Sequence, residues 1–189
     1  MCYTCCRRWQ MIRGKLVELR LMKKEDIELF VQLTNDTSHT GQHFPYIVRT
    51  LSDTIKHYNE DGFFSPSGGR LLIFDLEDNL VGAISYFKNA HYVEGYELGY
   101  QIFRQENRGK GYVSEALKLF SAFLFEHYPI NRLQICMEKD NLASEAVAKK
   151  CGFVYEGTMR DAWTVGGRKI SNLTYSMIRD EAPKLKDLL

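Results

Sequence analysis

Hydrophobic and polar residues alternate with two different periods in the first third of the chain. Residues 15–21 alternate loosely, as in a strand, and the first strand is therefore expected after Gly14. Residues 23–35 follow a helical repeat with acidic residues in the first turn. The apolar face of this helix is expected to consist of Ile27, Phe30, Val31 and Thr34. A short helix over residues 50–59 and a loop over residues 61–69 follow.

The middle of the chain carries three strand patterns and one long helix pattern. Two strand-like runs within residues 70–87 flank residues 77–79, Glu-Asp-Asn, which predict a hairpin turn. A third strand is expected over residues 96–103. Beyond two glycines, apolar residues recur at spacings of three and four, and this predicts an amphipathic helix that Pro129 ends.

The last third of the chain repeats the same alternation of periods. Residues 132–138 predict a strand, and residues 141–152 predict a short helix with a C-terminal glycine. Residues 153–160 and 170–178 flank a Gly-Gly turn and predict a final hairpin. The order is strand, helices, three strands, helix, strand, helix and two strands. It predicts an α+β fold with a largely antiparallel sheet and one crossover helix.

Length and charge narrow the class of protein. The 189 residues fit one domain with a real core, expected over residues 11–182 and followed by a tail at 183–189. Lys and Arg number 25 against 24 Asp and Glu, which argues against a nucleic-acid or membrane-surface binder. No apolar run approaches the roughly 20 residues that span a bilayer. The five histidines show no metal-ligand spacing, so no metal ion is expected.

The cysteines indicate a reducing compartment, and a cytoplasmic location is expected. Cys136 lies in a strand pattern and Cys151 at a helix end, and both are predicted to be small buried residues. The three N-terminal cysteines have no second pair at zinc-finger spacing. We interpret residues 1–10 as a disordered and non-essential extension, because the sequence from Met11 resembles a protein start.

Two glycines, Gly109 and Gly111, stand where the long helix is about to begin. The N–H groups of a first helical turn have no partner in the helix and form a ready anion site. Glycines remove the side chains that would block it, and Arg104, Arg108 and Lys110 add positive charge. The expected ligand carries phosphate. Neither a P-loop nor a Gly-x-Gly-x-x-Gly dinucleotide motif is present, and Gly-x-Gly alone could also make a simple tight turn.

The wider context of these glycines resembles a known family. "ELGYQIFRQENRGKGYVSEALKLF" and the later "NLASEAVAKKCGFVYEG" resemble the GNAT N-acetyltransferases, in particular the RimJ/RimL-like ribosomal-protein N-terminal acetyltransferases. The resemblance covers about residues 14–179, with Val113 in place of a small residue of the motif. It implies the GNAT fold and acetyl-CoA, with pyrophosphate on residues 108–113 and pantetheine paired to residues 101–103. The residues that it assigns to acetyl-CoA are Gln101, Ile102, Phe103, Arg108, Gly109, Lys110, Gly111, Tyr112, Val113, Asn141 and Ser144.

The resemblance also implies catalytic roles. Glu97 is the candidate base, acting through water, with Glu94 as the second choice and a solvated or salt-bridged glutamate as the structural alternative. The tyrosine acid of many relatives is missing, because Ala148 occupies its position. Ser144 is then the candidate proton donor, unless it only satisfies the first turn of its helix. Tyr100, Phe103 and Phe153 are expected in the core rather than as clamps on the cofactor. Trp163, near the Gly-Gly turn, is expected to serve in packing, with the wall of an acceptor cleft as the alternative.

The acceptor is less defined by the sequence, because residues 35–66 and the final hairpin would build its pocket. At pH 7 an α-amine costs roughly 1.4 kcal/mol to deprotonate and a lysine roughly 4.6 kcal/mol. A site with one glutamate base and no tyrosine acid is better suited to the amine that is easier to deprotonate, the α-amine of a protein, peptide or amino-acid-like molecule. Acetylation of a small-molecule amine such as an antibiotic or polyamine, and a non-catalytic CoA-binding domain, are the alternatives. A homodimer is an open alternative to a monomer.

Overall fold

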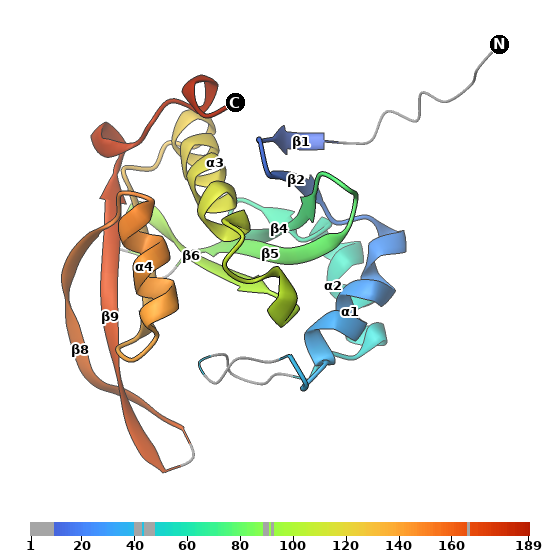
Figure 1. Cartoon of the computed structure of the whole chain (residues 1–189), viewed down its shortest axis with the longest axis horizontal. Coiled ribbons are helices and arrows are strands. Elements are labelled where there is room, and N and C mark those ends of the chain that lie inside the picture. Colours follow the sequence, from blue (N-terminus) through green and yellow to red (C-terminus); the bar gives the residue numbers. More distant parts are fainter. Residues whose placement is uncertain (1–9, 40–42, 44–47, 89–90, 92, 166) are drawn as a thin grey trace.

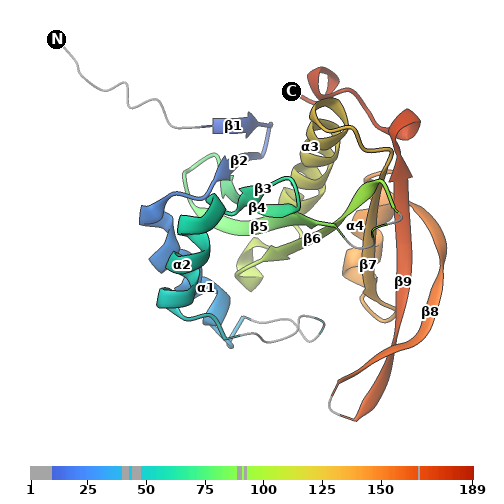
Figure 2. The same cartoon turned by 180° about the vertical axis from the view of Figure 1, so that it is seen from behind.

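The computed structural model describes residues 10–39, 43, 48–88, 91, 93–165 and 167–189. Within these residues the chain forms one nine-stranded sheet with helices on both faces (Figures 1 and 2). The elements are β1 (Gln10–Arg13), β2 (Val17–Leu21), α1 (Ile27–Asn35), α2 (Leu51–Asp61), β3 (Phe64–Ser65), β4 (Gly68–Asp75), β5 (Leu80–Phe87), β6 (Gly95–Ile102), α3 (Tyr112–His127), β7 (Arg132–Glu138), α4 (Leu142–Lys150), β8 (Val154–Val165) and β9 (Arg168–Ile178).

The sheet has the order β1-β2-β4-β5-β6-β7-β9-β8, with the short β3 paired to β4. Every neighbouring pair is antiparallel except β6 and β7, which α3 connects as a crossover. The α+β class, the mostly antiparallel sheet and the single crossover helix predicted from the sequence are therefore confirmed.

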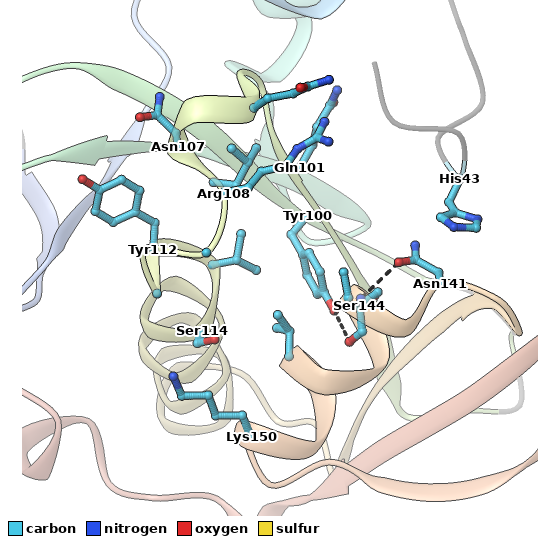
Figure 3. Close-up of a pocket in the computed structure, with 17 residues that line it drawn as sticks. His43, Tyr100, Gln101, Asn107, Arg108, Tyr112, Ser114, Asn141, Ser144 and Lys150 are labelled. Carbon is cyan, nitrogen blue, oxygen red and sulfur yellow. Dashed lines mark hydrogen bonds between the residues drawn. The ribbon is translucent and has the colours of Figure 1, made fainter. Parts of the chain in front are cut away.

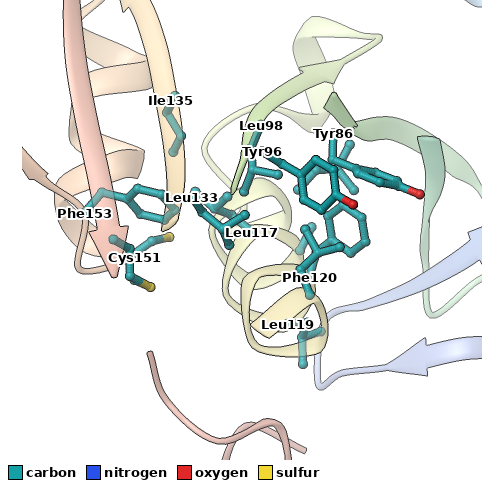
Figure 4. Close-up of a cluster of buried hydrophobic side chains, with 14 of the residues drawn as sticks. Tyr86, Tyr96, Leu98, Leu117, Leu119, Phe120, Leu133, Ile135, Cys151 and Phe153 are labelled. Atoms are coloured by element: carbon teal, nitrogen blue, oxygen red, sulfur yellow. The ribbon is translucent and has the colours of Figure 1, made fainter. Parts of the chain in front are cut away.

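The two faces of the sheet hold separate apolar clusters. Helices α3 and α4 cover one face, where their buried side chains pack on alternate residues of β5, β6 and β7 (Figure 4). This cluster contains Leu98 of β6, Leu133 of β7, and Leu117 and Phe120 of α3. Helices α1 and α2 cover the other face, with Ile27, Phe30 and Leu33 in contact with its smaller cluster. Successive residues of β6 therefore point alternately to the α3/α4 face and to the α1/α2 face of the sheet.

Several boundaries differ from the sequence prediction. Gln10–Arg13 form β1 against β2, so the prediction that the first strand begins after Gly14 is wrong. Helix α1 buries Leu33 rather than Thr34, whose hydroxyl donates to the Phe30 carbonyl at 2.8 Å. The loop predicted at 61–69 contains β3 and the start of β4. The predicted disorder of residues 1–10 falls, apart from Gln10, outside the described residues.

The C-terminal residues and the cysteines also have defined positions. Leu185 and Leu188 pack against the larger core, and the Leu185 N–H donates to the Glu126 carboxylate of α3 at 2.8 Å. Cys151 is buried as predicted, whereas Cys136 is only partly buried and faces away from α3 and α4, next to Thr174. Over the residues that the structure describes, none of the helices combines the length and apolarity needed to cross a bilayer.

Candidate active site

The parallel strands β6 and β7 separate after only three paired positions. Their register runs from Gly95↔Arg132 to Glu97↔Gln134 and ends there. On its other edge β6 stays paired with β5 as far as Ile102, and β7 stays paired with β9 as far as Glu138. The sheet therefore opens as a wedge whose vertex lies at Glu97, and one side of the wedge is the edge of β6 beyond that residue.

The amides of alternate β6 residues point into this wedge. The Phe103 N–H donates to the Val81 carbonyl of the strand next to β6 at 3.0 Å. Since hydrogen-bonding direction alternates along an antiparallel pair, Tyr100 and Ile102 direct their N–H and C=O groups to the opposite edge. Of the two backbone positions expected from the sequence, Ile102 faces the wedge, while the Phe103 amide is used within the sheet and its side chain is buried with Phe30.

The glycine loop lies beside the wedge and begins α3. Gly109 and Gly111 have positive φ angles of 74° and 86°, a region that L-residues with side chains rarely adopt. Gly111 is the N-cap of α3, so the N–H groups of the first turn face outward next to it. A Cβ on Gly109 would meet no protein atom within 4 Å. The loop therefore exposes its backbone on the side away from the core, as an anion cradle requires.

A cavity of about 650 Å³ joins the β6 edge, the glycine loop and the start of α4 (Figure 3). Sequence-predicted residues that line it are Gln101, Ile102, Arg108, Gly109, Gly111, Tyr112, Val113, Asn141 and Ser144. Phe103 and Lys110 are not among its lining residues. The Arg108 guanidinium, which also donates to the His39 carbonyl at 2.7 Å, and the Lys150 side chain place positive charge on the wall.

Three polar groups meet where α4 begins. The Asn141 side chain accepts from the Ser144 N–H at 3.1 Å, so Asn141 caps the helix and leaves the Ser144 hydroxyl available for other contacts. That hydroxyl lies 2.8 Å from the Tyr100 hydroxyl, which also approaches the Ser144 carbonyl at 3.2 Å (Figure 3). Burial raises the pKa of Tyr100 to about 12, although the Ser144 hydrogen bond acts against this. Both hydroxyls are therefore protonated at neutral pH.

Glu97 lies at the vertex of the wedge and on the opposite face of the sheet from Tyr100. The Gln134 side chain, from the facing position on β7, donates to the Glu97 carboxylate at 2.9 Å. Cys136 lies close enough for the Glu97 charge to add to burial in raising the pKa of its thiol to about 11. Glu94, the second choice, is exposed and precedes β6.

Sequence reasoning missed some cavity residues. Tyr100 packs against the core as expected, but its hydroxyl also reaches Ser144, a contact that the expectation of packing did not include. His43 lines the cavity and lies 2.8 Å from the Glu138 carboxylate. Nothing in the pattern of the sequence connects these two residues, which are 95 positions apart.

The residues present fit acetyl-CoA. Exposed first-turn amides and two cations suit phosphates, an open β6 edge suits an amide-containing chain, and the volume lies in the range of small-molecule sites. In the part of the chain that the structure describes, no three His, Cys, Asp or Glu side chains group as metal ligands do.

Comparison with known proteins agrees with this geometry. The model of the family described as "Acetyltransferase (GNAT) domain" matches residues 17–154. YdaF of Bacillus subtilis, whose name assigns it to the ribosomal N-acetyltransferases, is 33% identical over 110 residues, 58% of this chain and 58% of that protein. The spermidine N(1)-acetyltransferase of Vibrio cholerae is 19% identical over 79% of this chain and 86% of its own length. The structure of RimL, a ribosomal L7/L12 α-N-protein acetyltransferase in complex with coenzyme A, superimposes with a TM-score of 0.74 at 23% identity, covering 87% of this chain and 95% of that one.

The family model spans well over half of the chain and includes β6, the glycine loop, α3, β7 and α4. The same elements build the wedge and the cavity. The chain therefore belongs to the GNAT family of acetyl-CoA-dependent acetyltransferases.

Proposed function

We propose that the protein acetylates the α-amine of a protein, peptide or amino-acid-like acceptor, using acetyl-CoA. The observation that carries the proposal is the wedge between β6 and β7, which has a cofactor-sized cavity on one face and Glu97 at its vertex on the other. A thioester held in the wedge can be approached by an amine from the Glu97 face, so cofactor and acceptor need not compete for one entrance.

The backbone would do most of the cofactor binding. The N–H groups at the start of α3 would hold the pyrophosphate, with Arg108 and Lys150 as additional cations. The N–H groups of Tyr100 and Ile102 point into the wedge, where one of them can donate to the carbonyl oxygen of the thioester as negative charge develops on it. Acetyl-CoA supplies the activated acyl group and a thiolate leaving group.

Glu97 would accept the proton that the amine loses, through a water molecule. The Gln134 amide orients its carboxylate, and both lie on the face of the sheet opposite the cofactor cavity. The proton must leave before or during attack, because a protonated amine has no lone pair. Neutralising an α-amine at pH 7 costs only about 1.4 kcal/mol, which suits a single carboxylate base better than a lysine acceptor would.

Ser144 and Tyr100 would return a proton to the leaving thiolate. A serine hydroxyl alone is a poor acid, but here a second hydroxyl lies 2.8 Å away. If the Ser144 hydroxyl donates to sulfur, the Tyr100 hydroxyl can donate to the Ser144 oxygen and support the charge that this oxygen gains. Ala148, at the position of the missing tyrosine, is fully buried and cannot contribute.

A polyamine or another small amine is the second candidate acceptor. The similarity to a spermidine acetyltransferase supports it, whereas YdaF and RimL support a protein N-terminus. Release of CoA thiol in the presence of a panel of peptides, amino acids and polyamines distinguishes the two classes. Acetyl-CoA binding without turnover of any amine would instead indicate a non-catalytic CoA-binding domain.

Mutation of the base tests the mechanism. Glu97→Gln should lower kcat/KM by about 10²-fold, and the loss should shrink as pH rises towards the pKa of the acceptor, because more amine is then neutral. Glu94→Gln is the matched control, because that carboxylate is exposed and precedes the strand. Equal effects of the two substitutions, or a small and pH-independent effect of Glu97→Gln, would remove Glu97 from the mechanism.

A further inference from the structure

Two arginines stack on one aromatic ring on the Glu97 face of the sheet. Arg70 belongs to β4, and Arg49 lies just before α2. Their guanidinium carbons lie 5.0 Å and 6.0 Å from the centroid of the Phe30 ring, and Arg70 is also 5.9 Å from the ring of Phe63. Phe30 therefore holds two like charges within a small volume.

Hydrogen bonds of the backbone fix both arginines in place. The Asn35 side chain, at the end of α1, accepts from the Arg49 N–H at 2.9 Å and donates to the Arg49 carbonyl at 2.7 Å. The Arg70 N–H donates to the Phe63 carbonyl at 2.7 Å. The two side chains thus arise from anchored positions, and their proximity is a consequence of the fold.

Neither guanidinium has a counter-charge within the part of the chain that the structure describes. Among the described residues, no hydrogen bond or ion pair reaches the side chain of Arg49 or Arg70. The other two arginines stacked on phenylalanine differ, because Arg20 pairs with Glu18 and Asp78, and Arg179 donates to three backbone carbonyls.

The missing counter-charge has an energetic consequence. Burial, with a contribution from the Arg49 charge, lowers the pKa of Arg70 to about 10, and burial lowers the pKa of Arg49 as well. Partly buried cations without an anion are unfavourable, and stacking on an aromatic ring offsets only part of that cost. A bound anion would remove the penalty.

The sheet register connects this pair to the reaction site. Arg70 is directly opposite Ser85 on β5, and Ser85 is directly opposite Gly99 on β6. With neighbouring strands about 4.8 Å apart, the Arg70 backbone is ~10 Å from Gly99. Gly99 has no side chain, and the Ser85 hydroxyl donates to the Gly99 carbonyl at 3.2 Å. Ser85 and Gly99 are therefore the residues directly across the sheet from Arg70, and Glu97 lies two residues along β6 from Gly99, opposite Phe87.

We propose that Arg49 and Arg70 bind a carboxylate of the acceptor, so that the acceptor is an amine with an acidic group several ångströms from its nitrogen. Two guanidinium groups at one place suit a carboxylate through charge-assisted hydrogen bonds. Spermidine, which carries only positive charge, would be repelled. The inference rests on the proposed function, because it assigns the Glu97 face to the acceptor. Two sources can supply the acid: a peptide side chain near the N-terminus, or a free amino acid.

Matched acceptors test the assignment and identify the source of the acid. Two peptides begin with Ser and differ only in Asp against Asn at the second residue, and free glutamate is compared with glutamine. Wild-type kcat/KM should favour the acidic member of one pair by about tenfold to hundredfold, the range of one hydrogen bond to a charged group. The peptide pair reports a protein or peptide acceptor, and the amino-acid pair reports a small molecule. Spermidine is the third type of acceptor.

Variants then locate the selectivity. Arg70→Gln should bring the acid-to-amide ratio to within about twofold of one, without a matching loss on the amide substrate, and Arg49→Gln should lower the ratio as well. Lys56→Gln, on the exposed face of α2, is the control for net charge and should keep the wild-type ratio. Melting temperatures check folding, and Arg49→Gln carries the test if Arg70→Gln is unstable.

Calorimetric binding of the same acceptors to the CoA-loaded protein separates this inference from the proposed function. Acid-selective binding that both arginine variants lose, without turnover, would support the anion site while refuting acetyl transfer. A ratio near one in wild type, selectivity retained in both arginine variants, or a preference for spermidine would overturn the inference, even if acetyl transfer itself is observed.

Discussion

The glycine loop allows a prediction in which backbone strain and ligand contact can be measured separately. Gly109, Gly111 and Gly62 all have positive φ, at 74°, 86° and 64°. Alanine at any of them costs roughly 1–2 kcal/mol in the left-handed region, and a smaller entropy of the unfolded chain returns about 0.4–1 kcal/mol. A net loss of roughly 1 kcal/mol should lower Tm by about 2–4 °C in a chain of this size.

The stabilisation that acetyl-CoA gives to the fold should differ between alanine variants at these three glycines. Gly62 ends α2 and does not line the cavity, whereas Gly109 and Gly111 do line it. At 100 times Kd, acetyl-CoA should stabilise the wild-type protein by about 2.7 kcal/mol; if a methyl group weakens binding a hundredfold, the same concentration stabilises by only about 0.4 kcal/mol. A Cβ on Gly111 would also lie 3.3 Å from the flexible end of Leu16, a tight contact that a small shift can relieve.

The assay is thermal unfolding with and without acetyl-CoA. Gly62→Ala should lower Tm but keep the full ligand-induced increase, while Gly109→Ala and Gly111→Ala should lower Tm by similar amounts and lose most of that increase. If both loop variants keep the wild-type increase, the backbone at residues 109–111 does not hold the phosphates, and the anion-cradle interpretation is wrong.

Three further predictions follow from other contacts. Glu115→Ala should lower the free energy of unfolding by roughly 2–3 kcal/mol in urea titrations. The reason is that the Glu115 carboxylate accepts from three successive backbone N–H groups, those of residues 15–17. A change below about 0.5 kcal/mol would contradict this. Arg132 lowers the pKa of Glu156 to about 2, so the ion pair stabilises the fold above the pKa near 4.5 of the unfolded chain and this stability is lost as the pH falls. Acid titrations from pH 5 to 2 should therefore show a steeper loss of stability in wild type than in Glu156→Gln. Parallel curves would refute the linkage. Tyr100→Phe should reproduce the kcat loss of Ser144→Ala, and this loss should grow at high pH, where solvent protonates the thiolate less readily. The double variant should be no worse than either single variant. Fully additive losses would mean that the two hydroxyls act separately.

Local patterns were sufficient to predict most helices and strands. The periods of α3 and β7 are strong because each buries one complete face, so the sequence must repeat at 3.6 or 2 residues. Strand β1 was missed for the opposite reason. It has four residues, and pairing to β2 rather than any periodicity of its own holds it in place. The same holds for the C-terminal residues around Leu185, which a contact with α3 positions.

Within the candidate site, the residues found from the sequence are those whose chemistry depends on neighbours in the chain. Gly109 and Gly111 are recognisable because a backbone anion site needs no side chains at a helix start, and Asn141 because a helix cap lies next to its helix. Glu97 and Ser144 came from the family resemblance. The contact between the Tyr100 and Ser144 hydroxyls depends on the orientation of β6 against α4, and the two residues are 44 positions apart in the chain.

By itself, the sequence determined the α+β order of elements and the place of the glycine loop at the start of α3, because both are encoded in short-range spacing of apolar residues and glycines. Only the tertiary structure decided that β6 and β7 separate beyond Glu97, that Tyr100 meets Ser144, and that Arg49 joins Arg70 over one ring. These arrangements bring together residues from 19 to 44 positions apart, and their positions depend on strand register and helix packing, which no local stretch of sequence specifies.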